Sequence, residues 1–422
     1  MSNAYQKNVV LRLCSQPRTF EFISSHASGI DPVGVHAILT ELTKEGKLRK
    51  KNKMWEAQDG TKSPTLEFAD HQAPPYLKKY MGHFDFLKIP HPLDFEWRNS
   101  KRSLNYLTAE LQKITESADR VLILGMPTLF ANISENALPQ RVTLVERNQP
   151  IIDGLKRFVD DKCQIREADI FCIAPESLGN FDCVFMDPPW YPKHFRQFVW
   201  LAARCLKVGG TLAISIPPLN TRPDIDVERL QWLQFCQQQG LCIENLYANR
   251  LEYTMPFFEF NAVRAAGIQD ILPFWRKGDF VTFRKMKDQH SEREAPDQGV
   301  DGWVEKEIDT VRFRIKKESS KDVEKFSYKP LVKGDILTSV STREPYRSLR
   351  EQANLWTSGN RIFKISNPGL FLSCIDKVNG AAAKDGYAAD VHSFISEITT
   401  LEKGEYSEYL DWVYYEMERQ IT

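Results

Sequence analysis

The chain has 422 residues, 42% of them hydrophobic and 27% charged, so it is long enough for two or three soluble domains. Lys plus Arg and Asp plus Glu both number 56, and this balance excludes a large basic footprint for nucleic acid. No apolar run is long enough to span a membrane and no signal peptide is evident, so we expect a cytoplasmic protein without a membrane partner. The eight cysteines form no CxxC pair, which predicts reduced, buried thiols and no metal site.

Residues 1 to about 60 predict three short helices followed by a hairpin. Asp31-Pro32 is typical of a helix start, with proline at the first helical position. Apolar residues then recur at helical spacing from Val33 to Leu42. Two short strands, between Gly46 and Glu56, are expected to flank a basic tip.

This order of elements resembles a winged helix-turn-helix, and the resemblance covers only this segment. The basic tip contains Lys50, Lys51 and Lys53, which could contact the phosphates of a nucleic acid. The same hairpin could instead be a solvated part of a protein-docking module. Both interpretations remain open.

Residues 61–118 are expected to be a linker with entry helices. Lys62-Ser63-Pro64 and Pro74-Pro75 break the chain, and a helix is expected from Ser103 to Glu116. Strands and helices then alternate from 119 to 268, which predicts an α/β domain with a mostly parallel, doubly wound, Rossmann-like sheet. Leu241–Ala248 and Phe258–Ala265 are expected to close this sheet as an antiparallel pair.

Residues 269–422 are expected to form a separate α+β domain. Lys285–Gly299 is polar and is expected to loop out, and strand-like segments follow at 311–315, 335–340 and 361–365. Helices are expected from Asp390 to Thr400 and through Met417 to the end. The segment from Asn354 to Arg361 is distinctive but indicates no function, and this domain could bind a protein partner.

The sequence Asp187-Pro188-Pro189-Trp190 directly follows an apolar strand, Phe181–Met186. In an open α/β sheet, ligands bind beyond the carboxyl ends of the strands. There Asp187 could accept a hydrogen bond from an amine, and the prolines would stiffen the loop and leave carbonyl oxygens as acceptors. Trp190 would offer a flat face to a planar substrate.

Acids stand at the ends of three successive predicted strands, and a glycine follows the first strand. This arrangement of Gly125, Glu146, Asp169 and Asp187 resembles the class I methyltransferases that use S-adenosylmethionine. The resemblance covers roughly residues 95–267. It implies that Gly125 lets the backbone approach the methionine part of the cofactor and that Glu146 binds the ribose hydroxyls. It also implies that Asp169 binds the adenine amino group, with Ile170 beside the ring.

The tetrapeptide resembles the motif of amino-methyltransferases that act on exocyclic amines. The implied function is N-methylation of an amino group, above all the exocyclic amine of adenine in nucleic acid or a nucleotide. Asp187, Pro188, Pro189 and Trp190 would then form the catalytic set. Trp190 and Tyr191 would stack on the substrate ring, and a base in a duplex would have to be flipped out.

Two alternatives stay open. The layout also resembles the branched-chain polyamine synthases (bis-aminopropyl spermidine synthases), which place a winged-helix unit before a methyltransferase-like domain and transfer aminopropyl groups. That family carries an acidic cluster after its first-strand glycine, whereas this chain has Met126-Pro127-Thr128. The methyltransferase family usually has several glycines in the same loop, whereas Gly125 stands alone here, and a catalytically degenerate binding scaffold is the third interpretation.

Overall fold

A computed structural model describes residues 4–58, 86–94, 96–289, 291–295, 302–316, 326–341, 345–378 and 386–419. The chain divides into two compact units. The first unit comprises Met1–Lys88, Arg98–Thr254 and Asp270–Asp297, and the second comprises Ile89–Trp97, Met255–Gln269 and Gln298–Thr422. The two predicted proline breaks of the linker lie outside the described residues, as does part of the predicted polar loop after Lys285.

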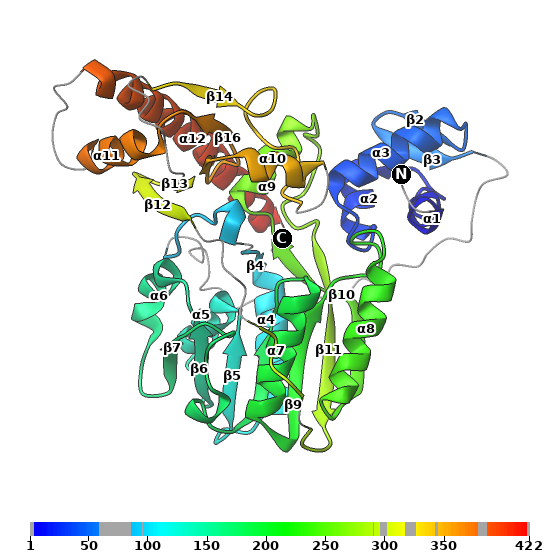
Figure 1. Ribbon diagram of the computed structural model, residues 1–422. Coiled ribbons are helices and arrows are strands. Elements are labelled where there is room, and N and C mark those ends of the chain that lie inside the picture. Colours follow the sequence, from blue (N-terminus) through cyan, green and yellow to red (C-terminus); the bar gives the residue numbers. More distant parts are fainter. Residues whose placement is uncertain are drawn as a thin grey trace. The chain divides into compact units, whose positions relative to one another are not determined.

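The N-terminal module has the predicted order of three helices and a hairpin. Its elements are α1 (Ala4–Leu13), β1 (Arg18–Thr19), α2 (Phe20–His26), α3 (Pro32–Lys44), β2 (Leu48–Lys51) and β3 (Met54–Ala57) (Figure 1). The three strands form an antiparallel sheet in the order β1-β3-β2. Asp31 caps α3, because its side chain accepts a hydrogen bond of 2.9 Å from the Gly34 backbone N–H.

An eight-stranded sheet forms the centre of the first unit, in the order β4-β10-β11-β9-β8-β5-β6-β7. The parallel strands are β5 (Arg120–Leu124), β6 (Arg141–Glu146), β7 (Cys163–Glu167), β8 (Phe181–Met186) and β9 (Leu206–Ile216). The antiparallel strands are β4 (Arg98–Asn99), β10 (Leu241–Thr254) and β11 (Lys277–Lys285). The predicted mostly parallel, doubly wound sheet is confirmed.

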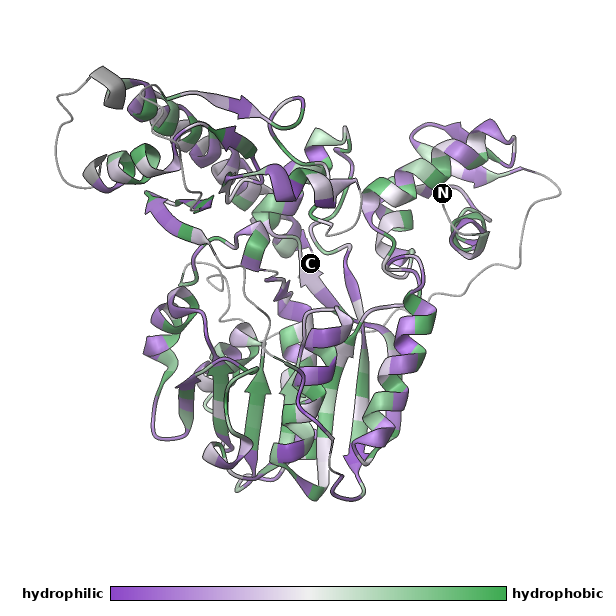
Figure 2. Cartoon of the chain, in the orientation of Figure 1, coloured by the Kyte–Doolittle hydropathy of each residue, from purple (hydrophilic) through white to green (hydrophobic). Residues whose placement is uncertain are grey.

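Helices cover both faces of this sheet, which explains why its central strands are apolar on both sides. The helices are α4 (Lys101–Ile114), α5 (Pro127–Glu135), α6 (Gln149–Leu155), α7 (Pro192–Cys205) and α8 (Ile225–Gln238). In the sheet β5 is buried from Val121 to Leu124, and Figure 2 shows most of this strand as hydrophobic. Along the chain, β6 pairs with β5 and β7 pairs with β6. The next strand, β8, pairs with the other edge of β5. The strand order therefore reverses between β5 and β8, which is where α/β sheets bind ligands.

The predicted closing pair of strands is wrong in its second member. Phe257–Ala265 is a helix, α9, and the partner of β10 is β11. The run Phe257-Phe258-Glu259-Phe260 is buried throughout, and such a run does not distinguish a strand from a helix by its period. The predicted domain boundary at 268 is also wrong, because β11 belongs to the sheet while α9 belongs to the second unit.

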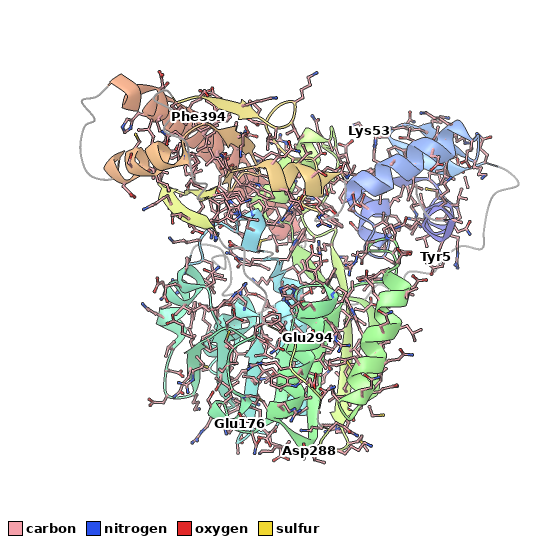
Figure 3. The ribbon with its side chains drawn as sticks, in the orientation of Figure 1. Tyr5, Lys53, Glu176, Asp288, Glu294 and Phe394 are labelled. Atoms are coloured by element: carbon pink, nitrogen blue, oxygen red, sulfur yellow. The ribbon has the colours of Figure 1, made fainter. Side chains whose placement is uncertain are left out.

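The second unit contains a five-stranded antiparallel sheet in the order β12-β13-β15-β16-β14. Its elements are β12 (Trp303–Ile308), β13 (Val311–Lys316), β14 (Tyr328–Pro330), α10 (Tyr346–Gln352), β15 (Leu355–Thr357), β16 (Ile362–Ile365), α11 (Pro368–Val378) and α12 (Gly386–Arg419). Phe394 on α12, labelled in Figure 3, packs in the aromatic core of this unit. The predicted strand at 335–340 is only an isolated bridge at Ile336, and the two predicted C-terminal helices are the single helix α12.

All eight cysteines are free thiols. Six are buried, but Cys172 and Cys242 are exposed, so the expectation of buried thiols is wrong for these two. Within the described ranges, no helix combines the length and apolarity that crossing a membrane requires.

Candidate active site

Gly125 and Asp187 meet at the point where the strand order reverses. Leu124 and Met186 end the neighbouring parallel strands β5 and β8, and they are paired in register. The Asp187 backbone N–H donates to the Leu124 carbonyl at 3.1 Å. Gly125 has a φ of +70°, and a Cβ atom there would lie 2.8 Å from the Asp187 carbonyl oxygen. Only glycine fits this position, and the two loops are in direct backbone contact.

Glu146 and Asp169 lie at the same edge of the sheet as Gly125, at the end of β6 and just after β7. Glu146 Oε1 accepts hydrogen bonds of 2.8 Å from the backbone N–H groups of Arg147 and Asn148. Asp169 Oδ1 accepts from the Phe171 N–H at 2.8 Å, and its Oδ2 accepts from the Arg147 guanidinium at 2.9 Å. Both carboxylates are therefore oriented, and an adenine amino group at Asp169 would replace an exposed ion pair, which costs little.

Ile170 is held through its backbone. Its carbonyl accepts a hydrogen bond of 2.7 Å from Gln197 Nε2 on α7. The Ile170 side chain is half-buried. This fixes the loop after β7 against the helix that follows the Asp187 loop.

The loop that begins at Asp187 is a stiff connection into α7. The Tyr191 N–H donates to the Pro189 carbonyl at 2.7 Å, and Pro192 stands at the first helical position of α7. Arg222 donates to the Trp190 carbonyl at 2.6 Å. Tyr191 is half-buried, with its ring centroid 6.3 Å from that of His194, and its role in substrate binding stays a prediction.

The Asp187 carboxylate is surrounded by hydrogen-bond donors. The hydroxyl oxygens of Tyr253 and Ser215 lie 2.5 Å apart, and these hydroxyls and the Trp190 indole are the hydrogen-bonding groups that act on the pKa of the Asp187 carboxyl. Burial raises the pKa of Asp187 to about 7, and these hydrogen bonds together with the charge of Arg276 oppose the rise. A carboxyl with this pKa can accept a hydrogen bond from an amine and can also take up its proton near neutral pH.

Trp190 is less open than the sequence indicates. Its side chain is 7% exposed, and the Arg276 guanidinium carbon lies 4.5 Å from the centroid of its ring system. The Tyr253 ring stands nearly perpendicular to it, with the centroids 5.8 Å apart. Stacking of a substrate ring on Trp190 stays a prediction, and it would require Arg276 to move away.

Three residues at this site were not predicted from the sequence. Ser215 lies near the end of β9, Tyr253 lies near the end of β10, and Arg276 immediately precedes β11. Since β11 is antiparallel to both β9 and β10, its start and the end of β10 reach the same edge as the end of β9. A signal for Ser215 is its hydroxyl within the otherwise apolar run Leu212–Ile216, but placing Tyr253 and Arg276 requires knowing how β10 and β11 pair.

Comparison with known proteins gives similarity of structure only. Neither a scan of protein-family models nor a search of curated sequences finds a match. Two similar solved structures are of a branched-chain polyamine synthase from Thermus thermophilus, a mutein and the parent protein, each in complex with N4-aminopropylspermidine and 5'-methylthioadenosine. Their TM-scores are 0.57 and 0.52 at 16% and 14% identity, and each similarity covers 69% of this chain and 90% of the other.

A third similar structure is a TehB-like S-adenosylmethionine-dependent methyltransferase from Corynebacterium glutamicum. It has a TM-score of 0.31 at 14% identity, and it covers 42% of this chain and 86% of the other. At these identities the likeness concerns the fold. The chain thus has a Rossmann-like fold similar to that of these branched-chain polyamine synthase structures.

Proposed function

We propose that this chain transfers a methyl group from S-adenosylmethionine to an amine nitrogen held at Asp187. The observation that carries the proposal is the backbone contact between Gly125 and Asp187, at the reversal of strand order. This contact brings together the loop after β5, which would hold the methyl donor, and the loop after β8, which would hold the amine acceptor. The pKa of Asp187, raised by burial to about 7, suits an acid that accepts a proton from nitrogen.

The residues at the ends of β5, β6 and β7 fit this cofactor. Gly125 leaves room at the backbone, Glu146 would bind the ribose hydroxyls, and Asp169 and Ile170 would flank the adenine. The sulfonium of the bound cofactor would supply an already electrophilic methyl carbon. The chain's own task is then mainly to orient the nitrogen, which is a large source of rate acceleration in bimolecular reactions.

Asp187 would perform that orientation. Its carboxylate and the Pro188 carbonyl would accept the two N–H groups of the amine and direct the nitrogen lone pair toward the methyl carbon. The bound cofactor would supply the methyl group and would leave as the neutral thioether, while the Asp187 carboxylate would take the proton that leaves nitrogen. The hydroxyls of Tyr253 and Ser215, whose oxygens lie 2.5 Å apart, would help to hold the carboxylate in place.

The exocyclic amine of adenine is our finer proposal for the acceptor. An adenine ring could lie against Trp190 only after Arg276 has left its face. An adenine in a duplex would also have to be flipped out, at a cost of about a few kcal/mol. A substrate panel of DNA, RNA, nucleotides, polyamines and proteins with labelled cofactor tests this choice.

Aminopropyl transfer to a polyamine is the second candidate, and the similarity in fold to the polyamine synthase favours it. Two features of the donor loop favour methyl transfer. Met126-Pro127-Thr128 offers no carboxylate for the ammonium group of an aminopropyl donor. In addition, the start of α5 has no side-chain cap, so its backbone N–H groups suit the carboxylate of S-adenosylmethionine.

Calorimetry with the two cofactors separates these candidates. We expect S-adenosylmethionine to bind and its decarboxylated form to bind more weakly. The reverse order would establish the second candidate. Absence of binding of either at millimolar concentration would leave only a non-catalytic scaffold.

Two pairs of variants test the cofactor residues. We expect Gly125→Ala to lose cofactor binding, because its Cβ would lie 2.8 Å from the Asp187 carbonyl, whereas a Cβ at Gly404 on α12 meets nothing within 4 Å and Gly404→Ala should bind normally. Glu146→Gln should weaken binding, while Glu176→Gln, at an exposed acid labelled in Figure 3, should not. Equal affinity of Glu146→Gln and wild type would remove the ribose contact.

Nucleic-acid binding through Lys50, Lys51 and Lys53 remains a proposal with its own test. The Lys50 ammonium lies 4.3 Å from the Trp55 ring centroid, and Lys53, labelled in Figure 3, lies 3.8 Å from an Asp270 oxygen. If all three contact phosphate, replacing them with alanine should reduce the salt slope of binding by about 2 to 3. Lys113→Ala, on α4, is the control, and an unchanged slope in the triple variant would end the proposal.

A further inference from the structure

The segment after β11 returns to α7 instead of looping out as the sequence predicts. The Ser291 carbonyl accepts hydrogen bonds from the Trp200 indole at 3.0 Å and from the Arg204 guanidinium at 2.9 Å. The Ser291 hydroxyl donates at 2.8 Å to Oε1 of Gln239, the residue that follows α8. Trp200 and Gln239 are both buried. Residues 291–294, which we call the strap, are therefore anchored at their start to two core elements of the domain.

A second anchor follows at Glu294, which Figure 3 labels. Its carboxylate lies 2.5 Å from Arg196 Nε on α7, and the Arg196 guanidinium carbon lies 4.2 Å from the centroid of the Phe235 ring on α8. Both members of the ion pair are partly exposed, so the pair alone contributes little stability. Its effect is geometric. Because Ser291 and Glu294 are both attached to α7, the backbone that carries Arg293 is held against this helix.

Arg293 reaches from the strap to the turn after β7. Its Nη2 donates to the Ile173 carbonyl, and the carbonyl oxygens of Ile170 and Cys172 lie 3.5 Å from its guanidinium nitrogens. The guanidinium carbon lies 5.0 Å from the centroid of the Trp200 ring system. Carbonyl dipoles that converge repel one another, and a guanidinium, which only donates, offsets this repulsion. Arg293 therefore stabilises the arrangement in which these carbonyls face the strap.

The same turn, residues 169–173, holds the carboxylate that is proposed to bind adenine. The N–H groups of Cys172 and Ile173 donate to the Asp169 carbonyl at 2.8 and 2.9 Å, and the Phe171 N–H donates to Asp169 Oδ1 at 2.8 Å. The turn thus directs three N–H groups toward Asp169 and its carbonyls toward Arg293. A change in the shape of the turn would alter both sets of contacts, so the direction of the Asp169 carboxylate depends on Arg293.

We propose that Arg293 is a positioning residue for adenine recognition. It holds the 169–173 turn in the shape that presents the Asp169 carboxylate to the 6-amino group of the cofactor. This inference rests on the proposed function and adds to it a residue that acts through the turn. The base selectivity of the cofactor site then depends on a segment that follows the last strand of the sheet, far along the chain from β7.

Hypoxanthine is the base that tests this geometry. It has a carbonyl oxygen where adenine has the 6-amino group, so at that atom it cannot donate to a carboxylate. A site that is built to hydrogen-bond an N–H group rejects an analogue that lacks it. The ratio of the affinities for the two bases therefore reports how well Asp169 is placed. A purely structural role of Arg293 would weaken both affinities by the same factor.

Arg293→Gln is the decisive variant, because it removes the charge and most of the donors. Calorimetry of the full chain with S-adenosylhomocysteine and S-inosylhomocysteine measures the affinity ratio. We expect the variant to lower this ratio about tenfold, which is the effect of about one hydrogen bond. Arg293→Lys should give an intermediate ratio, since an ammonium keeps the charge but not the planar fork. Arg166→Gln, at an exposed arginine of β7, is the matched control and should keep the wild-type ratio.

Hydrogen exchange gives a readout that needs no ligand. In Arg293→Gln the amides of Cys172 and Ile173, which donate to Asp169, should exchange about tenfold faster because the turn is released. The amides of β5 and β8 should keep their protection, which shows that the variant is folded. Arg166→Gln should exchange like the wild type at all of these positions.

The two measurements separate the possible outcomes. If the wild type binds either compound, a lower affinity ratio in Arg293→Gln supports the proposal, and an unchanged ratio overturns it even if both affinities fall. If the wild type binds neither compound, the proposed function fails, and exchange alone decides whether Arg293 shapes the turn. Faster exchange at Cys172 and Ile173 then supports that role, and exchange at the wild-type rate overturns it.

Discussion

Among the described residues, two carboxyl groups have their pKa raised by burial to about 7, and their side chains differ in exposure. Glu402, on α12 in the second unit, is fully buried. It accepts hydrogen bonds from Thr357, from the Ser358 hydroxyl at 3.3 Å and from the Gly359 N–H at 2.8 Å. Arg361 lies 3.4 Å from it as its counter-ion. Asp187, in the first unit, keeps part of its surface exposed.

A raised carboxyl pKa therefore shows that the group is buried, and it does not by itself show that the group is catalytic. The surroundings of Glu402 form a closed network of charge and hydrogen bonds on a single stretch of chain. The same stretch pairs Trp356 Nε1 with Asn360 Oδ1 at 3.1 Å. The distinctive segment from Asn354 to Arg361 is therefore explained as strand β15 and the buried turn that follows it, whereas Asp187 lies at a sheet edge of the kind where ligands bind.

The sharpest test of the comparison is the activity of Asp187→Ala. If Asp187 orients the amine and accepts its proton, transfer should fall by about 10²- to 10⁴-fold while cofactor affinity is retained. Single-turnover transfer of labelled methyl measures the first quantity, and calorimetry measures the second. Glu402→Ala, assayed per folded molecule, should transfer at the wild-type rate, and an unchanged rate in Asp187→Ala would remove its catalytic role.

The next largest effect is expected on stability. Glu402→Ala leaves the Arg361 guanidinium, which is 3% exposed, without one of its counter-ions. We expect a loss of about 3–5 kcal/mol in the free energy of unfolding of the second unit, measured by denaturant titration. Glu397→Ala, at an exposed position of the same helix, should change stability by less than about 0.5 kcal/mol. A small loss in Glu402→Ala would show that the network is not closed.

Gly359→Ala tests the same network by crowding it. A Cβ at Gly359 would lie 2.5 Å from the carboxyl carbon of Glu402, which has no room to move because it is fully buried. We expect a loss of about 2–3 kcal/mol. Gly404→Ala, with nothing within 4 Å of its added atom, should be neutral or slightly stabilising. Equal melting temperatures of the two variants would contradict the close contact.

The smallest expected effect is on the pH dependence of stability. Both acids have folded pKa values above their ordinary ones, so each stabilises the fold in its neutral form, and this contribution is lost as pH rises through about 7. The free energy of unfolding of Asp187→Asn, relative to that of wild type, should therefore be about 1–2 kcal/mol higher at pH 8 than at pH 5. Thermal melts at the two pH values measure this, and two transitions should be followed where the units unfold separately. A constant difference between variant and wild type would place the Asp187 pKa at its ordinary value.

The residues at the carboxyl ends of the parallel strands could be predicted from the sequence, because the alternation of strands and helices shows where each strand ends. Gly125, Glu146, Asp169 and Asp187 follow four such strands, and the structure places all four at one edge. Pairings between distant segments leave no local pattern. The contact of Arg147 with Asp169 and the closure of the sheet by β11 are of this kind, and each changes what the site presents to a ligand.

The backbone contact at Gly125 limits how the substrate range of a chain with this fold can change. The spacing between donor and acceptor loops is set by main-chain atoms in contact, so substitution of side chains does not adjust it in small steps. Variants that accept a bulkier or differently charged amine would have to arise at the periphery, among residues such as Arg276. Directed evolution should therefore find its gains outside the tetrapeptide that begins at Asp187.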